Sequence, residues 1–181
     1  MKSTIRRYFF ILVFAVLTTG GVFAQYAPAV ADNKLFINAG IGFGPTGGYN
    51  LGILPISGSV DFKLPISLPI TVGVGVTYTT WKWNLGFMTV SLMNIGIGGR
   101  AMYHINLLDK LDTYAGVTLG YVIQSAKAEA DNYQNSVKGE PFFLYGANLG
   151  ARYFFTNLIG AYIEAGYSSL QYANVGLTIK F

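Results

Sequence analysis

The sequence contains no cysteine, and only 11% of its 181 residues are charged. Without cysteine the chain has no disulfide framework, no thiolate zinc site and no thiol nucleophile. An average soluble domain carries about 25% charged residues, so this chain has few groups with which to cover a hydrated surface. Its 52% hydrophobic content excludes a disordered chain, which needs low hydrophobicity and high charge. The length fits a single domain.

Long hydrophobic runs are also scarce. The apolar run Tyr8–Leu17 is shorter than the ~20 residues that a membrane-spanning helix needs. Basic residues precede it, and small residues suited to cleavage follow it at Val22-Phe23-Ala24. This pattern predicts a secretory signal peptide over Met1–Ala24, followed by a short periplasmic segment over 25–33.

Removing this segment changes the charge. Three of the twelve basic residues lie in it, which leaves nine basic against eight acidic residues and a net charge of about +1. The mature chain has no cluster of Lys and Arg with interleaved aromatic residues, so nucleic acid is not an expected partner. No cofactor or metal is expected either, because His, Cys and carboxylates form no cluster in the sequence.

What the mature chain does contain is alternation. Apolar residues alternate with small or polar ones, which is the period of a β-strand; Ile56–Leu64 and Ile70–Thr79 are the clearest examples. The pattern predicts eight strands, at Lys34–Gly44, Ile56–Leu64, Ile70–Thr79, Thr89–His104, Thr113–Ile123, Phe142–Phe154, Ile159–Tyr167 and Tyr172–Phe181.

The lengths of strands and connections favour a membrane barrel. Most strands have nine to eleven residues or slightly more, enough for a tilted strand to cross a bilayer. An even number of strands leaves both chain ends on the periplasmic side, with short turns there and longer loops outside. The expected inner turns are Pro65–Pro69, Ile105–Asp112 and Phe155–Leu158. The expected outer connections are Pro45–Pro55, Thr80–Met88 and Gln124–Pro141, with a tight fourth one at Ser168–Gln171.

Alternation alone does not say which face points outward, since a soluble lipocalin-like barrel also has eight strands, with apolar residues inside. Two features favour an apolar exterior. The polar strand faces carry only six charged residues, too few for a soluble exterior, at Asp61, Lys63, Arg100, Arg152, Glu164 and Lys180.

Secondly, aromatic residues on the apolar face gather at the strand ends, as they do at the two boundaries of a bilayer. The outer girdle comprises Phe43, Tyr78, Tyr121, Phe143, Tyr145 and Tyr167, and the inner girdle Phe62, Tyr103, Tyr153 and Phe181. Lipid offers no partner to an open sheet edge. The sequence therefore predicts an all-β fold over 34–181, a closed antiparallel eight-stranded up-and-down transmembrane β-barrel.

The alternation and the C-terminal stretch Tyr172–Phe181 resemble the small OmpA/OmpX-like β-barrels of Gram-negative outer membranes. The resemblance covers the mature chain as a pattern rather than as a residue motif. It implies a location in the outer membrane, in contact with its lipid. It also implies that the assembly machinery reads the terminal strand, through Val175, Leu177, Ile179 and Phe181.

An eight-stranded barrel is just wide enough for its own side chains. Charged side chains inside must pair, because an isolated buried ion is very costly, and Glu164 is expected to pair with Arg152 or Arg100. The charged set can act as a plug that stiffens the barrel or as a polar gate; the narrow lumen favours the plug.

The expected outer loops hold the candidate surface residues. Trp81 and Trp83 serve either as a binding platform or as interfacial anchors. The polar segment 125–140 is expected to be a mobile exposed loop that contacts host or surface molecules, and it contains Lys127, Glu129, Asp131, Tyr133 and Lys138.

The leading functional hypothesis is a structural or surface-interaction protein with a plugged or very narrow polar lumen. The alternative is a narrow channel for small solutes, comparable to OmpW transport, and the third is a lipid-modifying enzyme. No enzymatic activity is expected, because His104, the single histidine, has no Ser/Asp constellation near it in the sequence and is read as a satisfied or solvent-facing residue of the inner rim.

Overall fold

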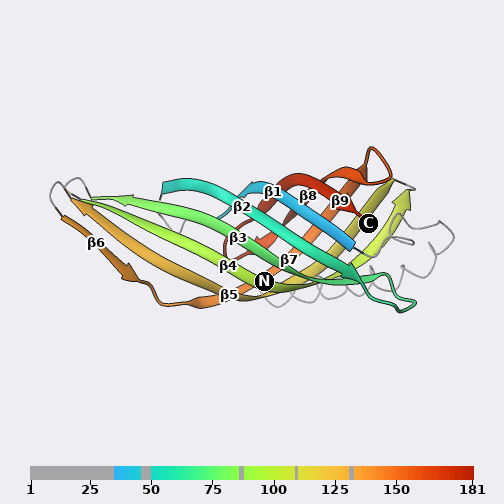
Figure 1. Ribbon diagram of the computed structural model, residues 1–181, viewed down its shortest axis with the longest axis horizontal. Helices are drawn as coiled ribbons and strands as arrows, with labels where there is room; N and C mark the ends of the chain where they lie inside the picture. The colour runs from blue at the N-terminus through green and yellow to red at the C-terminus, as the bar shows by residue number, and fades with distance from the viewer. Residues whose placement is uncertain (1–34, 46–49, 86–87, 109, 131–132) are drawn as a thin grey trace, which may run out of the picture.

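The computed structural model describes residues 35–181 except 46–49, 86–87, 109 and 131–132. The predicted signal peptide and the segment 25–33 therefore lie outside the described residues. In the described part no helix is long and apolar enough to cross a membrane. The strands (Figure 1) are β1 (Leu35–Phe43), β2 (Asn50–Lys63), β3 (Ile70–Asn84), β4 (Thr89–Leu108), β5 (Leu111–Ala130), β6 (Tyr133–Lys138), β7 (Phe142–Phe154), β8 (Ile159–Ser168) and β9 (Ala173–Lys180).

Eight of these strands close into a barrel. The hydrogen-bonded order is β4-β3-β2-β1-β9-β8-β7-β5, and pairing of β4 with β5 completes the ring. The first and last strands of the ring pair antiparallel from Phe36 opposite Lys180 to Phe43 opposite Ala173. Closure leaves the ring without an open edge, and the predicted eight-stranded antiparallel barrel is confirmed. The short strand β6 lies outside the ring, beside β5.

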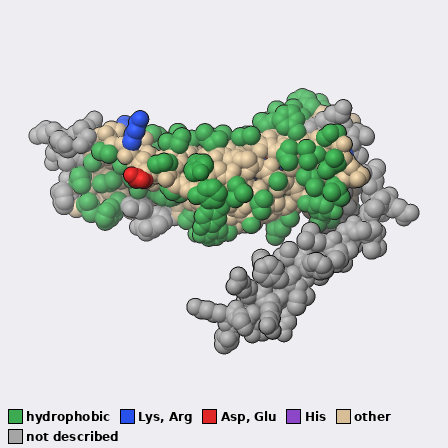
Figure 2. All heavy atoms as spheres, turned by 90° about the horizontal axis from the view of Figure 1, so that it is seen from below, with side chains coloured by type: hydrophobic (Ala, Val, Ile, Leu, Met, Phe, Trp, Pro, Cys, Tyr) green, Lys and Arg blue, Asp and Glu red, His purple; other side chains and the backbone are tan. Residues whose placement is uncertain are grey.

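The two faces of the wall differ as alternation requires. Val74, Leu149 and Val175 point outward and are more than half exposed, whereas Thr71 and Asn94 point inward and are fully buried. Figure 2 shows apolar side chains spread over the outer surface of the barrel. The lipocalin-like alternative, with an apolar interior and a charged exterior, is therefore wrong.

Aromatic side chains form a row on the outer surface. Across β5, β7, β8 and the residue before β9, neighbouring ring centroids lie 5.7 to 6.4 Å apart. The row, named here the outer aromatic row, comprises Tyr121, Phe143, Tyr145, Tyr167 and Tyr172. Phe43 adjoins it, because the amide of Tyr172 donates to the Phe43 carbonyl at 2.8 Å. Tyr78 points outward from β3. At the other end, Phe62, Tyr153 and Phe181 are exposed and Tyr103 is half-buried.

The strand ends differ most from prediction on one side of the barrel. The segment Phe142–Phe154 has the predicted bounds, and β4 begins at the predicted Thr89. In contrast, β3 continues to Asn84 and β5 to Ala130, past their predicted ends, and β2 begins six residues before its predicted start. The expected loop at 125–140 is largely a hairpin, in which Ser125 pairs with Lys138 and Ala130 with Tyr133. The loop prediction is therefore wrong for these paired residues, since neighbouring strands extend their hydrogen bonding into the solvent.

This one-sided extension, which we call the projecting sheet, comprises Asn50–Ile53, Thr80–Asn84, Thr89–Met93, Ser125–Ala130 and β6, and it extends to the left in Figure 1. Its polarity is the reverse of the barrel's. The register places Lys82, Ser91, Lys127 and Ser136 in one outward row. It places Trp81, Leu92, Ala126 and Val137 in the neighbouring row, which begins at the buried Trp81 and ends at the exposed Val137. Polar residues on the outside of a sheet suit an extension that water surrounds.

Candidate functional site: the barrel lumen

The lumen is filled in three layers that follow one another from the end where Leu35 and Phe181 pair to the outer end. Inward positions of the strands supply an ionic layer, then a small polar chamber, then an apolar cap. Each layer combines residues from strands far apart in the sequence. In an eight-stranded ring, strands on opposite walls are separated by several other strands.

Two buried arginines organise the ionic layer. The Arg100 guanidinium contacts Glu164 at 2.6 Å and Asp61 at 3.2 Å. The Arg152 guanidinium contacts Asp61 at 3.0 Å and Asp112 at 3.3 Å. Asp61 therefore bridges both cations. Of the two partners predicted for Glu164, the structure places Arg100 against it.

Aromatic rings complete the surroundings of Arg152, which is fully buried. Its guanidinium carbon lies 4.4 Å from the ring centroid of Tyr114 and 5.0 Å from that of Phe36, within range for cation–π attraction. The Tyr114 hydroxyl donates to Glu164 at 2.9 Å. A desolvated cation held in this way couples four strands across the lumen.

The two predicted lysines lie at the inner end of this layer. Lys180 is 9% exposed, and its ammonium lies 4.1 Å from the Phe154 ring centroid. Lys63, the last residue of β2, is half-buried. Of the six predicted lumen charges, Asp61, Arg100, Arg152 and Glu164 meet directly in ion pairs.

Sequence reasoning missed two members of the ionic layer. His104 is 1% exposed; its Nδ1 lies 2.8 Å from Asp112 and its Nε2 lies 2.9 Å from the Thr71 hydroxyl. Asp112 is a fully buried residue of β5 rather than part of an inner turn. The view that His104 has no acidic partner is therefore wrong, whereas the view that it is satisfied holds. The register of the β4–β5 hairpin places Asp112 opposite Asn106, which lies two residues from His104. The contact between Asp112 and His104 could not be predicted from their spacing in the sequence.

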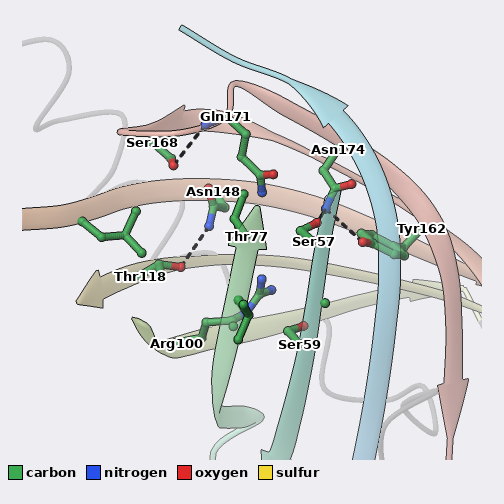
Figure 3. Close-up of a pocket in the computed structure, with 14 residues that line it drawn as sticks. Ser57, Ser59, Thr77, Arg100, Thr118, Asn148, Tyr162, Ser168, Gln171 and Asn174 are labelled. Atoms are coloured by element: carbon green, nitrogen blue, oxygen red, sulfur yellow. Dashed lines mark hydrogen bonds between the residues drawn. The ribbon is translucent and has the colours of Figure 1, made fainter. Parts of the chain in front are cut away.

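The middle layer is a small polar chamber (Figure 3). Its volume is about 30 Å³, room for one or two water molecules. Hydroxyl and amide groups line it: the Asn174 amide donates to Ser57 at 2.6 Å and to Tyr162 at 2.9 Å, and the Asn148 amide lies 3.3 Å from Thr118.

Above the chamber, an apolar cap lies at the outer end of the lumen. We define the cap as Trp81, Val122, Leu144 and Leu170, each at most 9% exposed, with Leu92 and Phe142 packed against them. Leu144 also lines the chamber, so the two layers touch. The prediction that Trp81 belongs to an outer loop is wrong: it lies in β3 and points inward.

Leu170 reaches across the whole lumen from the turn between β8 and β9. A Cβ atom added to Gly96 of β4, on the opposite wall, would lie 2.6 Å from Leu170 Cδ1. The Ser168 hydroxyl accepts from the amides of Leu170 at 3.2 Å and Gln171 at 3.4 Å and so holds the turn. The expected tight turn is present, but its role in filling the lumen was not predicted.

The remaining predicted surface residues lie in the projecting sheet. Trp83 is 48% exposed in β3. Lys127 and Lys138 are exposed residues of β5 and β6. Glu129 and Tyr133 belong to the same two strands, and Asp131 lies outside the described residues.

Comparison with known proteins gives neither a matching family model nor a matching curated protein. Among solved structures, a major outer membrane protein from Thermus thermophilus superposes with a TM-score of 0.60 at 12% identity, over 83% of this chain and 100% of that one. Ail, the attachment invasion locus protein of Yersinia pestis, superposes with a TM-score of 0.51 at 16% identity, over 82% and 93%. This chain has the fold of a small outer-membrane β-barrel. At these identities the likeness concerns the fold alone.

Proposed function

We propose that this protein is an integral protein of a Gram-negative outer membrane, with a closed lumen, that interacts at the cell surface through its projecting sheet. One observation carries the proposal: ionic and apolar side chains fill the lumen at two heights, and one wall extends beyond the outer aromatic row. Apolar side chains between two aromatic levels match the two boundaries of a bilayer. The outward-facing Val175, Leu177, Ile179 and Phe181 suit the role of an assembly signal.

A closed lumen predicts that the protein does not conduct ions. Refolded protein in planar bilayers should give no steady single-channel current, because an ionic layer and an apolar cap block the lumen in series. The alternative, a narrow channel for small solutes, draws its support from the polar chamber. Steady currents from the wild-type protein would favour that alternative and contradict the closed lumen.

The projecting sheet offers two features to a partner. Its outward face carries the exposed lysines Lys82, Lys127 and Lys138. Along the described residues, β6 pairs with β5 alone, so its other edge presents backbone groups to an incoming strand or loop. These features support contact with host or surface molecules.

Deleting Lys127–Gly139 tests this role. The barrel should still fold, since the pairing of β5 with β7 ends at Val122 opposite Phe142, below the deleted segment. Heat-dependent gel mobility measures folding, and attachment of cells that display each version to a panel of extracellular-matrix proteins measures binding. Attachment should fall to the level of cells without the protein. Unchanged attachment would contradict a role for the hairpin, and an unfolded deletion variant would show that the hairpin is structural.

We propose no enzymatic activity. The Thr71–His104–Asp112 arrangement has the order of groups found in hydrolytic triads, but each of its members is at most 1% exposed. A substrate would have to enter the ionic layer to reach them. Lipid-modifying activity is therefore the weakest of the three hypotheses.

A further inference from the structure

An apolar groove of about 230 Å³ lies on the outside of the barrel, where the ends of β1 and β9 meet. Large side chains border it, and the small residues Gly42 and Ala173 lie between them. The bordering residues are Ile41, Phe43, Leu54, Ile163 and Val175. The remaining lining residue, Asn174, turns its amide nitrogen to Ser57 and Tyr162 in the lumen, so the groove offers apolar contact.

An irregularity of β2 supplies one border of the groove. Ile53 lies opposite Thr80 and Ile56 opposite Tyr78, so β2 uses one residue more than β3 over this stretch, which defines a β-bulge. Leu54 lies in the bulge and is 48% exposed. Pairing of β1 with β2 stops at Ile41 opposite Ile56, which leaves Leu54 beside the end of β1. Bulges redirect side chains, and here the redirected residue borders the groove.

The position of the groove along the barrel axis indicates which molecules surround it. Phe43 adjoins the outer aromatic row through the backbone of Tyr172, and Ile163 and Val175, paired directly across β8 and β9, lie below that row. The groove therefore occupies the outer half of the apolar band. Its walls are continuous with the surface that faces lipid. The molecules around the barrel at this level are lipid acyl chains, and each of their methylene groups is stabilised by apolar contact.

From this we infer that the groove holds one acyl chain of an outer-leaflet lipid more tightly than the lipids around it. The inference rests on the membrane location given above. A concave site contacts a chain on several sides, whereas the convex wall elsewhere contacts it on one, so the bound lipid should exchange more slowly than its neighbours.

Filling the groove tests the inference. The full-length protein, refolded into vesicles of phosphatidylethanolamine and phosphatidylglycerol and extracted in mild detergent, should retain one phospholipid in native mass spectra after the others are stripped. Ala173→Phe places a ring in the groove and should lower this retention about ten-fold. The control is Ala147→Phe, which adds the same ring at an exposed outward position of β7 opposite Tyr167 and should leave retention unchanged.

A second variant keeps the test open if Ala173→Phe does not fold. Leu54→Ala removes one border at a position without a partner on β1, and retention should again fall. Equal retention in all four proteins would overturn the inference. Recovery of a wild-type dimer that Ala173→Phe converts to a monomer would do the same, since a second copy would then fill the groove. A chain that fails to insert into vesicles would instead overturn the membrane location, and the lipid site with it.

Discussion

Replacing Arg152 with methionine should lower the free energy of unfolding of the barrel by about 3–5 kcal/mol. The guanidinium is fully buried and contacts both Asp61 and Asp112. Without it, two carboxylates in a desolvated layer lose a counter-charge, and that cost exceeds the loss of the contacts themselves. Urea titration of the protein in lipid vesicles, followed by gel mobility and tryptophan fluorescence, measures the change.

Two further variants separate charge from packing. Lys110→Met removes an exposed cation and should change the stability by no more than about 0.5 kcal/mol. Adding Asp112→Asn to Arg152→Met should recover part of the loss, because one unpaired carboxylate disappears. Equal stability of Arg152→Met and Lys110→Met would show that the ionic layer does not hold the barrel together.

Removing the two largest members of the cap should open the chamber to the outside. The natural chain has no cysteine, so Thr77→Cys places a single thiol at the chamber wall. In that background, Trp81→Ala with Leu170→Ala should raise the rate at which a membrane-impermeant thiosulfonate labels intact cells, by at least about ten-fold. The reason is that a close-packed interior excludes solutes, and these two side chains fill the outer end of the lumen.

The matched control for the cap removes comparable apolar groups from the lipid-facing surface. Leu149→Ala and Leu177→Ala, both on exposed outward positions, should leave the labelling rate of Thr77→Cys unchanged. Gel mobility verifies that each variant is folded. If the cap variants label no faster than these controls, access to the chamber is controlled elsewhere.

Much of the barrel is predictable because its rule is local. Alternate residues of a strand point to opposite faces, so a stretch such as Phe142–Phe154 reveals its bounds and its two faces without knowledge of its neighbours. The scarcity of charge and the aromatic residues at strand ends then indicate which face meets lipid. The same rule explains why the strand prediction fails beyond the outer aromatic row. There water surrounds the wall, and polar residues lie on its outside. Strand residues such as Lys82 and Lys127 therefore have the composition of a loop.

The sequence by itself determined the period of the strands, the closed class of the fold and the polar nature of the lumen. These follow from side-chain chemistry taken a few residues at a time. Only the tertiary structure decided that Arg152 lies between Asp61 and Asp112, that Leu170 packs against the opposite wall at Gly96, and that Leu54 borders a groove. Each of these contacts joins distant segments, and their alignment depends on the register with which the whole ring closes, a property that no single strand contains.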